Sequence, residues 1–145
     1  MISDEIYEWI IFDGFKHTSI ASLSKEAQKN CVVINGVSKC YAMTGWRIGY
    51  IAADAEIVKK VTKLQGQSTS GPCSISQAAS IEALVGPHDD VLEMVREFEK
   101  RRNVMVDQLA AIPGVSCNKP NGSFYSFPDF SELNGKKDRS GKVIQ

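Results

Sequence analysis

The sequence predicts an α/β fold, in which short buried strands come first and long helices follow. The first third of the 145-residue chain contains nearly continuous apolar runs, which are typical of strands buried on both faces of a sheet. From residue 54 onward, apolar side chains recur at helical spacing. With 43% hydrophobic residues, the chain can bury the core of one ordinary domain.

Three apolar segments are candidates for strands, at residues 1–3, 31–35 and 49–53. The first of them looks like the tail of a longer strand, and a polar helical turn at 24–30 leads into the second. Ligands of open α/β sheets gather at the carboxyl ends of the strands. Asp4 follows the first strand and Lys39 follows the second, so we expect their side chains to lie near one another.

Three helices are expected in the remainder of the chain. Asp54 can cap the first of them. The Ser-x-x-Gln pattern that begins at Ser74 is typical of a capping box and predicts a second helix, ending before Gly86. The longest helix is expected over residues 89–111, where a Pro-Gly pair follows it. Residues 115–130 alternate extended and turn residues, and residues 135–142 are polar and charged with no core-forming face.

Composition excludes several classes of protein. Seventeen basic residues balance seventeen acidic ones, which argues against a surface that binds nucleic acid. No apolar run approaches the length of a membrane span. Four cysteines are scattered without Cys-x-x-Cys spacing and only two histidines are present, so we expect no metal site. Free thiols indicate a reducing compartment, and the expected location is the cytoplasm.

The most informative segment is residues 36–49, which reads Gly-Val-Ser-Lys-Cys-Tyr-Ala-Met-Thr-Gly-Trp-Arg-Ile-Gly. It places Lys39 and Arg47 at a fixed separation and contains no other charged residue. Because Lys39 lies between two apolar runs, its amine should lie partly desolvated at the edge of the sheet. Lysines in that setting form Schiff bases with carbonyl compounds. A solvated loop lysine is the ordinary alternative.

This segment resembles the lysine signature of the fold-type I, pyridoxal-phosphate-dependent aminotransferases of the aspartate aminotransferase class. Besides Lys39, the matching positions include Gly45, Arg47 and Gly49. Residues 3–8 resemble the segment that holds the cofactor ring, and residues 122–125 resemble the start of the smaller domain of these enzymes. The resemblance covers essentially the whole chain, but the chain covers only the middle of such an enzyme.

The resemblance implies a fold in two parts. Residues 1–111 would be the C-terminal half of the large domain, a three-layer αβα unit with a mainly parallel sheet, including its long connecting helix. Residues 112–145 would begin the small C-terminal domain. The resemblance also implies a homodimer. The glycine-rich phosphate loop, the Asn-Pro-x-Gly segment and the substrate-binding arginine of the family have no counterpart here, so we expect a fragment that is inactive alone.

The resemblance assigns roles to four residues. Lys39 would bind the cofactor aldehyde and later move a proton, and Asp4 would keep the pyridine nitrogen protonated. Tyr7 would donate a hydrogen bond to the ring oxygen, and Arg47 would bind the phosphate. Outside the resemblance, Asp4 fits a strand-end turn and Tyr7 a half-buried aromatic residue. Many relatives carry a phosphate-binding hydroxyl three residues before the lysine, where this chain has Gly36.

The reaction implied by the resemblance is transfer of an amino group from an amino acid to a 2-oxo acid, with aspartate and 2-oxoglutarate as the first pair. A lyase or synthase reaction with the same cofactor is an alternative, because the groups that separate these reactions lie largely outside the segment. A third interpretation is a non-catalytic α/β fragment that packs on a partner chain.

Overall fold

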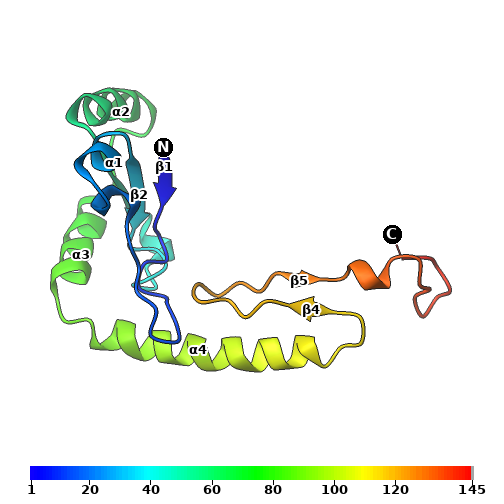
Figure 1. The fold of residues 1–145 in the computed structure, drawn as a ribbon. Coiled ribbons are helices and arrows are strands. Elements are labelled where there is room, and N and C mark those ends of the chain that lie inside the picture. Colours follow the sequence, from blue (N-terminus) through cyan, green and yellow to red (C-terminus); the bar gives the residue numbers. More distant parts are fainter. Residues whose placement is uncertain (145) are drawn as a thin grey trace.

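One three-stranded sheet and a long helix organise the computed structural model, which describes residues 1–144 (Figure 1). The sheet contains β1 (Ile2–Asp4), β2 (Val32–Gly36) and β3 (Gly49–Ala52). The helices are α1 (Lys25–Lys29), α2 (Ala55–Ser68), α3 (Ser74–Val85) and α4 (Asp89–Ala110). A second sheet contains β4 (Ser116–Cys117) and β5 (Pro128–Asp129). Short 3-10 helices are η1 (Ile20–Ser22), η2 (Thr44–Trp46) and η3 (Ser131–Leu133).

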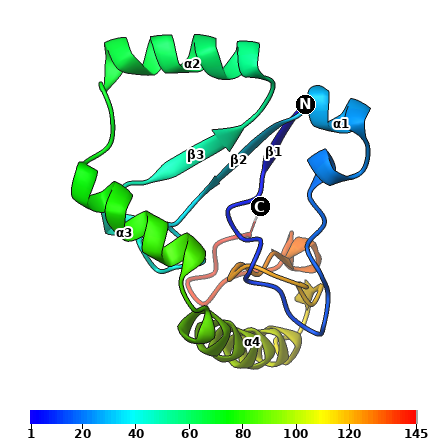
Figure 2. The same ribbon diagram turned by 90° about the vertical axis from the view of Figure 1, so that its left-hand side faces the viewer.

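The order of the main sheet is β1-β2-β3, so β2 is the central strand (Figure 2). β1 and β2 are parallel, and Asp4 lies opposite Ile34. β2 and β3 are antiparallel, and Gly36 lies opposite Gly49. The end of β1, the end of β2 and the start of β3 therefore meet at one edge of the sheet. The α/β class is confirmed, and the sheet within this chain has one parallel and one antiparallel pairing.

The fully buried core lies beside the sheet rather than on its two faces. Ile10, Phe12 and Cys40 form a buried cluster, against which Val95 and Phe98 of α4 pack. The strands themselves are largely accessible, since no residue of β3 is buried. The expectation that the strands are buried on both faces is therefore wrong for this chain, because the described helices leave much of the sheet uncovered.

Helix boundaries follow the sequence prediction closely. The Asp54 side chain caps α2 by accepting a hydrogen bond from the Glu56 N–H at 3.0 Å. α3 ends before Gly86, but its predicted capping box is wrong, because Ser74 is already the first helical residue and no side chain caps the helix. The Gln77 side chain instead donates to the Pro72 carbonyl at 2.9 Å. α4 ends within one residue of the predicted position.

The segment after α4 folds back along that helix (Figure 1). β4 and β5 are antiparallel, with Ser116 opposite Asp129, and an isolated bridge joins Ile11 to Gly122. Residues near the end of the chain thereby reach the region just after β1. None of the described helices has the length and apolar composition needed to cross a membrane. The domain boundary after residue 111 stays a prediction.

Candidate functional site

One cavity of about 510 Å³ lies at the edge of the sheet where the three strand ends meet. The structure brings all four sequence-predicted site residues to its wall: Asp4, Tyr7, Lys39 and Arg47. Further polar side chains in the wall are Asn35, Ser38, Thr44 and Tyr125. The expected convergence of the strand ends is confirmed by this arrangement, whereas the chemical roles of the four residues stay predictions.

Lys39 lies in the turn that follows β2, and its neighbours in sequence hold it in place. Val37 and Cys40 are fully buried, and the Cys40 thiol donates to the Ile6 carbonyl at 3.2 Å. The Lys39 side chain is half-buried, with its Nζ 5.4 Å from the centre of the Phe124 ring and 6.0 Å from that of Tyr7. The backbone on both sides of Lys39 is therefore anchored, and its amine lies near the rings of Phe124 and Tyr7, of which Tyr7 lines the cavity.

Asp4 ends β1 and serves two purposes. Its Oδ1 accepts a hydrogen bond from the Ile6 N–H at 3.2 Å, which is the strand-end turn that the sequence allows. The carboxylate also lines the cavity and is exposed. The turn and the cavity position are thus compatible, because the turn engages only one of the two oxygens.

Tyr7 is half-buried, and its hydroxyl donates to the Tyr125 hydroxyl at 3.0 Å. Burial of the phenol, the neighbouring Tyr125 hydroxyl and the Asp4 carboxylate raise the pKa of Tyr7 to about 12. At neutral pH, Tyr7 is consequently a hydrogen-bond donor and not a phenolate. A donor of this kind suits an anionic oxygen on a ligand in the cavity.

Arg47 follows η2 in a left-handed backbone conformation, with φ of 56°. Its Nη1 donates to the Thr44 carbonyl at 3.0 Å, which holds the side chain over the cavity wall. Among residues 1–144, no carboxylate forms an ion pair with Arg47. The exposed guanidinium therefore keeps donors for an anion such as a phosphate group.

The packing of β2 against β3 explains why position 36 is a glycine. A Cβ atom there would lie 2.8 Å from the Ile48 carbonyl oxygen and 3.0 Å from the Gly49 Cα atom. The close approach of β2 and β3 thus leaves no room for a side chain at this position of the chain. Ser38 also lines the cavity, and its backbone carbonyl accepts a hydrogen bond from the Thr44 hydroxyl at 3.0 Å.

Tyr125 is the site residue that sequence reasoning missed. Phe124 and Tyr125 do not form strand core, because both are exposed and lie outside β5. Tyr125 instead reaches Tyr7 across 118 residues of sequence. The similarity of residues 122–125 to the start of the small domain was the only available signal, and it did not reveal this contact.

A second group of ionisable residues lies beside Asp4. Glu5 is buried and its carboxylate accepts hydrogen bonds from Ser19 at 2.8 Å and Ser3 at 3.0 Å, and contacts the His17 Nε2 at 2.9 Å. A Glu8 carboxylate oxygen lies near this group but accepts a hydrogen bond from Asn35 at 2.8 Å. The group is therefore a hydrogen-bonded network that ties the loop after β1 to the sheet.

Because of this network, we expect the free energy of unfolding to fall at acidic pH. Burial alone would raise the pKa of Glu5, but hydrogen bonds from His17, Ser19 and Ser3 bring it below the ordinary value of 4.5. The unfolded chain then binds the proton more readily, so Glu5 contributes stability above pH 4.5 that is lost as pH falls through the lower folded-state pKa. We expect Glu5→Gln to flatten the fall in unfolding free energy below that pH.

Urea denaturation across the acid range measures this effect, with the exposed Glu132→Gln as the control. An acid dependence that is the same in Glu5→Gln as in the unsubstituted protein contradicts the assignment.

Comparison with known proteins places the chain in a family. Residues 1–142 match the family described as "Aminotransferase class I and II". Aspartate aminotransferase of Geobacillus stearothermophilus is 51% identical over 132 residues, which are 91% of this chain and 34% of that protein. Aspartate aminotransferase of Rhizobium meliloti is 44% identical over 145 residues, which are 100% of this chain and 35% of that protein.

Comparison with solved structures also identifies aminotransferases as similar proteins. The crystal structure of the aspartate aminotransferase from Rhizobium meliloti gives a TM-score of 0.96 at 44% identity and covers 99% of this chain and 36% of its own. The structure of the aromatic aminotransferase from Pyrococcus horikoshii gives a TM-score of 0.83 at 39% identity, and the match covers 88% of this chain and 34% of that protein's chain. The chain spans about a third of the length of these relatives. It belongs to the class I and II aminotransferase family.

Proposed function

We propose that the protein contributes the cofactor site of a pyridoxal-phosphate-dependent aminotransferase, which moves an amino group from an amino acid to a 2-oxo acid. One observation carries this proposal. An amine, a carboxylate, a phenol and a guanidinium, from Lys39, Asp4, Tyr7 and Arg47, line a single cavity. These residues come from two segments that are remote in sequence, residues 3–8 and 36–49, and the pairing of β1 with β2 brings the segments together.

The donor set fits pyridoxal phosphate group by group. Lys39 supplies an amine for the aldehyde, and Asp4 supplies an acid for the ring nitrogen. Tyr7 supplies a neutral donor for the ring oxygen, and Arg47 supplies a cation for the phosphate, with which no carboxylate of the described residues competes. When bound, this cofactor supplies an electron sink for the substrate carbanion.

The side chains of this chain then have distinct tasks. The Lys39 amine holds the cofactor and afterwards carries a proton to and from the substrate carbon. The Asp4 carboxylate holds a proton on the ring nitrogen by a charge-assisted hydrogen bond. The Tyr7 O–H stabilises negative charge on the ring oxygen. The two terminal nitrogens of Arg47 suit two phosphate oxygens at once.

The wider features of the enzyme also belong to the proposal. The relatives are named for aspartate, or for aspartate and prephenate, which supports a dicarboxylic amino acid as the donor. The relatives are about three times as long, so we assign the complete reaction to a protein of that length. We further propose a homodimer, the division into residues 1–111 and 112–145, and a cytoplasmic location, which the four free cysteines support.

Chemical labelling tests the proposed function. The chain is mixed with pyridoxal phosphate, reduced with borohydride and digested, and the modified peptide is identified by mass spectrometry. We expect the label on Lys39, and we expect it to disappear in Lys39→Ala but not in Lys63→Ala, which alters an exposed lysine of α2. Labelling spread over surface lysines, with no preference for Lys39, would argue for a non-catalytic fragment.

Arg47→Ala should chiefly weaken retention of the cofactor. Charge-assisted hydrogen bonds contribute about 1.5 to 3 kcal/mol, so we expect the dissociation constant to rise about 10- to 100-fold. Equilibrium dialysis measures this change. Arg101→Ala, which removes an exposed arginine of α4, is the matched control. Equal retention by Arg47→Ala and the unsubstituted protein would show that Arg47 does not bind the phosphate.

A further inference from the structure

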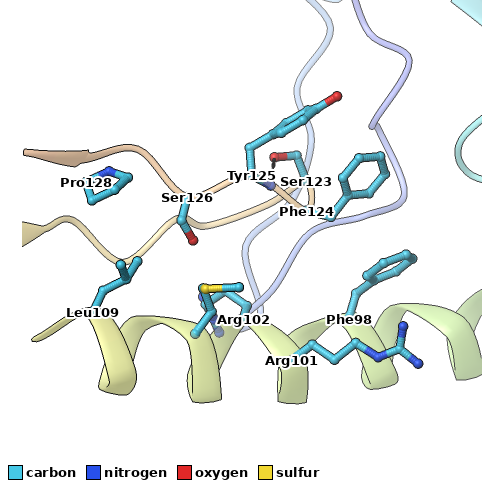
Figure 3. Close-up of a pocket in the computed structure, with 10 residues that line it drawn as sticks. Phe98, Arg101, Arg102, Leu109, Ser123, Phe124, Tyr125, Ser126 and Pro128 are labelled. Atoms are coloured by element: carbon cyan, nitrogen blue, oxygen red, sulfur yellow. Dashed lines mark hydrogen bonds between the residues drawn. The ribbon is translucent and has the colours of Figure 1, made fainter. Parts of the chain in front are cut away.

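Tyr125 connects the candidate site to a second cavity, of about 440 Å³, which lies between α4 and the segment leading to β5. Figure 3 shows this second cavity, with Phe98 and Arg102 of α4 directed toward the segment that carries Ser123 and Ser126. The Tyr125 side chain projects away from α4 in this view, and it also lines the candidate site. The segment that carries Tyr125 therefore separates the two cavities.

A buried arginine fixes this segment to α4. Arg102 is only 5% exposed and donates to both carboxylate oxygens of Asp13, at 2.8 and 3.1 Å. It also donates to the Pro120 carbonyl and contacts Glu99 at 3.3 Å. Lys119 contacts Asp13 at 3.1 Å. We call Arg102, Asp13, Glu99 and Lys119 the Arg102 cluster, and it joins three segments that are remote in sequence.

Backbone hydrogen bonds extend this attachment towards the site. The Phe12 N–H donates to the Asn121 carbonyl at 2.9 Å, and the Ser123 N–H donates to the Ile10 carbonyl at 2.8 Å. Gly122 is required between them, because a Cβ atom there would lie 2.7 Å from the Ile10 oxygen. Residues 10–12 and 121–123 are consequently held side by side without a full sheet.

The paired segments bring two aromatic side chains onto Tyr7. The Phe124 ring meets the Tyr7 ring edge-on, with centres 5.3 Å apart, and the Tyr125 ring does so at 5.8 Å. Only Tyr125 offers a polar contact, through its hydroxyl 3.0 Å from that of Tyr7. Tyr125 thus contacts the Tyr7 hydroxyl, while Phe124 packs against the Tyr7 ring.

We propose that Tyr125 is a positioning residue for the Tyr7 hydroxyl, and that the Arg102 cluster sets its place. A hydroxyl group has one donor and two acceptor positions. In this structure the Tyr7 hydroxyl donates to the Tyr125 hydroxyl. Rotation of the two hydroxyl protons reverses that hydrogen bond, so that Tyr7 accepts from Tyr125 and directs its own proton at a ring oxygen in the cavity. The role toward the cofactor rests on the proposed function, whereas the contact between the two hydroxyls does not.

The contact is tested first in the chain without cofactor. Tyrosine labelled with ¹³C at Cζ gives one NMR signal for each of the four tyrosines, and single Tyr→Phe variants assign them. We expect Tyr125→Phe to move the Tyr7 signal, and Tyr50→Phe, which removes a hydroxyl on β3, to leave it in place. An unmoved Tyr7 signal in Tyr125→Phe would overturn the proposal.

Substitutions of two neighbouring arginines, Arg102 and Arg101, test the role of the Arg102 cluster through the same Tyr7 NMR signal. Arg102→Lys keeps the charge but loses the two-point contact with Asp13, so we expect it to move the Tyr7 signal as Tyr125→Phe does. Arg101→Lys alters an exposed arginine and should leave the signal unchanged. If Arg102→Lys does not fold, Asp13→Asn provides the second variant. An unmoved signal in the folded variant would exclude the cluster from the positioning role.

The cofactor-bound chain tests the role toward the ring. A donor at the ring oxygen disfavours a proton on the neighbouring nitrogen that joins Lys39 to the cofactor. Loss of the Tyr125 hydroxyl should therefore raise the midpoint of the pH-dependent visible absorbance, by about 0.5 to 1 pH unit. Asp4 and Lys39 also face Tyr7, and both are unchanged in Tyr125→Phe and in the Tyr50→Phe control.

Failure of the proposed function and failure of the positioning role of Tyr125 give different results. Absence of label on Lys39 after borohydride reduction contradicts the proposed function. A labelled Lys39 with an unshifted midpoint in Tyr125→Phe contradicts only the positioning role.

Discussion

We expect Lys39→Ala to abolish transamination, when the rate is measured in a protein that spans the full length of the relatives. In the proposed function the Lys39 amine both holds the cofactor and moves the proton, and loss of the proton transfer alone would lower the rate about 100- to 10,000-fold. The structure adds that Lys39 cannot easily be replaced by a neighbour, because buried Val37 and Cys40 fix its turn. A coupled assay for the 2-oxo acid product measures the rate.

Lys63→Ala is the control for a general effect of removing a lysine, since Lys63 lies exposed on α2. Turnover that persists in Lys39→Ala at a tenth of the normal rate or more would refute the assignment.

Asp4→Asn should slow the same reaction about 100- to 1,000-fold, the range seen when one electrostatic contact that stabilises a transition state is removed. Asparagine can still accept the hydrogen bond from the Ile6 N–H, so the turn after β1 is kept. The substitution therefore removes only the negative charge that we propose for the ring nitrogen. Cofactor attachment to Lys39 should survive, and the defect should lie in exchange of the substrate α-proton, which is followed by NMR in deuterated water.

Asp107→Asn, on the exposed surface of α4, controls for the loss of one negative charge. If α-proton exchange in Asp4→Asn equals that of the unsubstituted protein, Asp4 serves the turn alone.

The convergence of the site was predictable from local sequence. Apolar runs located β1 and β2, and the rule that ligands gather at the carboxyl ends of strands placed Asp4 near Lys39. Arg47 came with the lysine signature, and the start of β3 opposite the end of β2 brings it to the same edge. These predictions succeeded because each depended on segments only a few residues long.

Contacts between remote segments were not predictable. The hydroxyls of Tyr7 and Tyr125 meet across 118 residues, and Arg102 meets Asp13 across 89. No local pattern encodes such pairs, because they depend on how α4 and the segment after it fold back. The prediction that the strands are buried on both faces was wrong for the same reason. An apolar run indicates that a strand can be buried, but it does not indicate which elements cover the strand.

The most direct test of the central claim is a crystal structure of the chain, or of the protein that contains it, grown with pyridoxal phosphate. We expect cofactor bonded to Lys39, with Asp4 at the ring nitrogen, Tyr7 at the ring oxygen and Arg47 at the phosphate. Cofactor bound elsewhere, or bound in this cavity with these side chains directed away from it, would contradict the account.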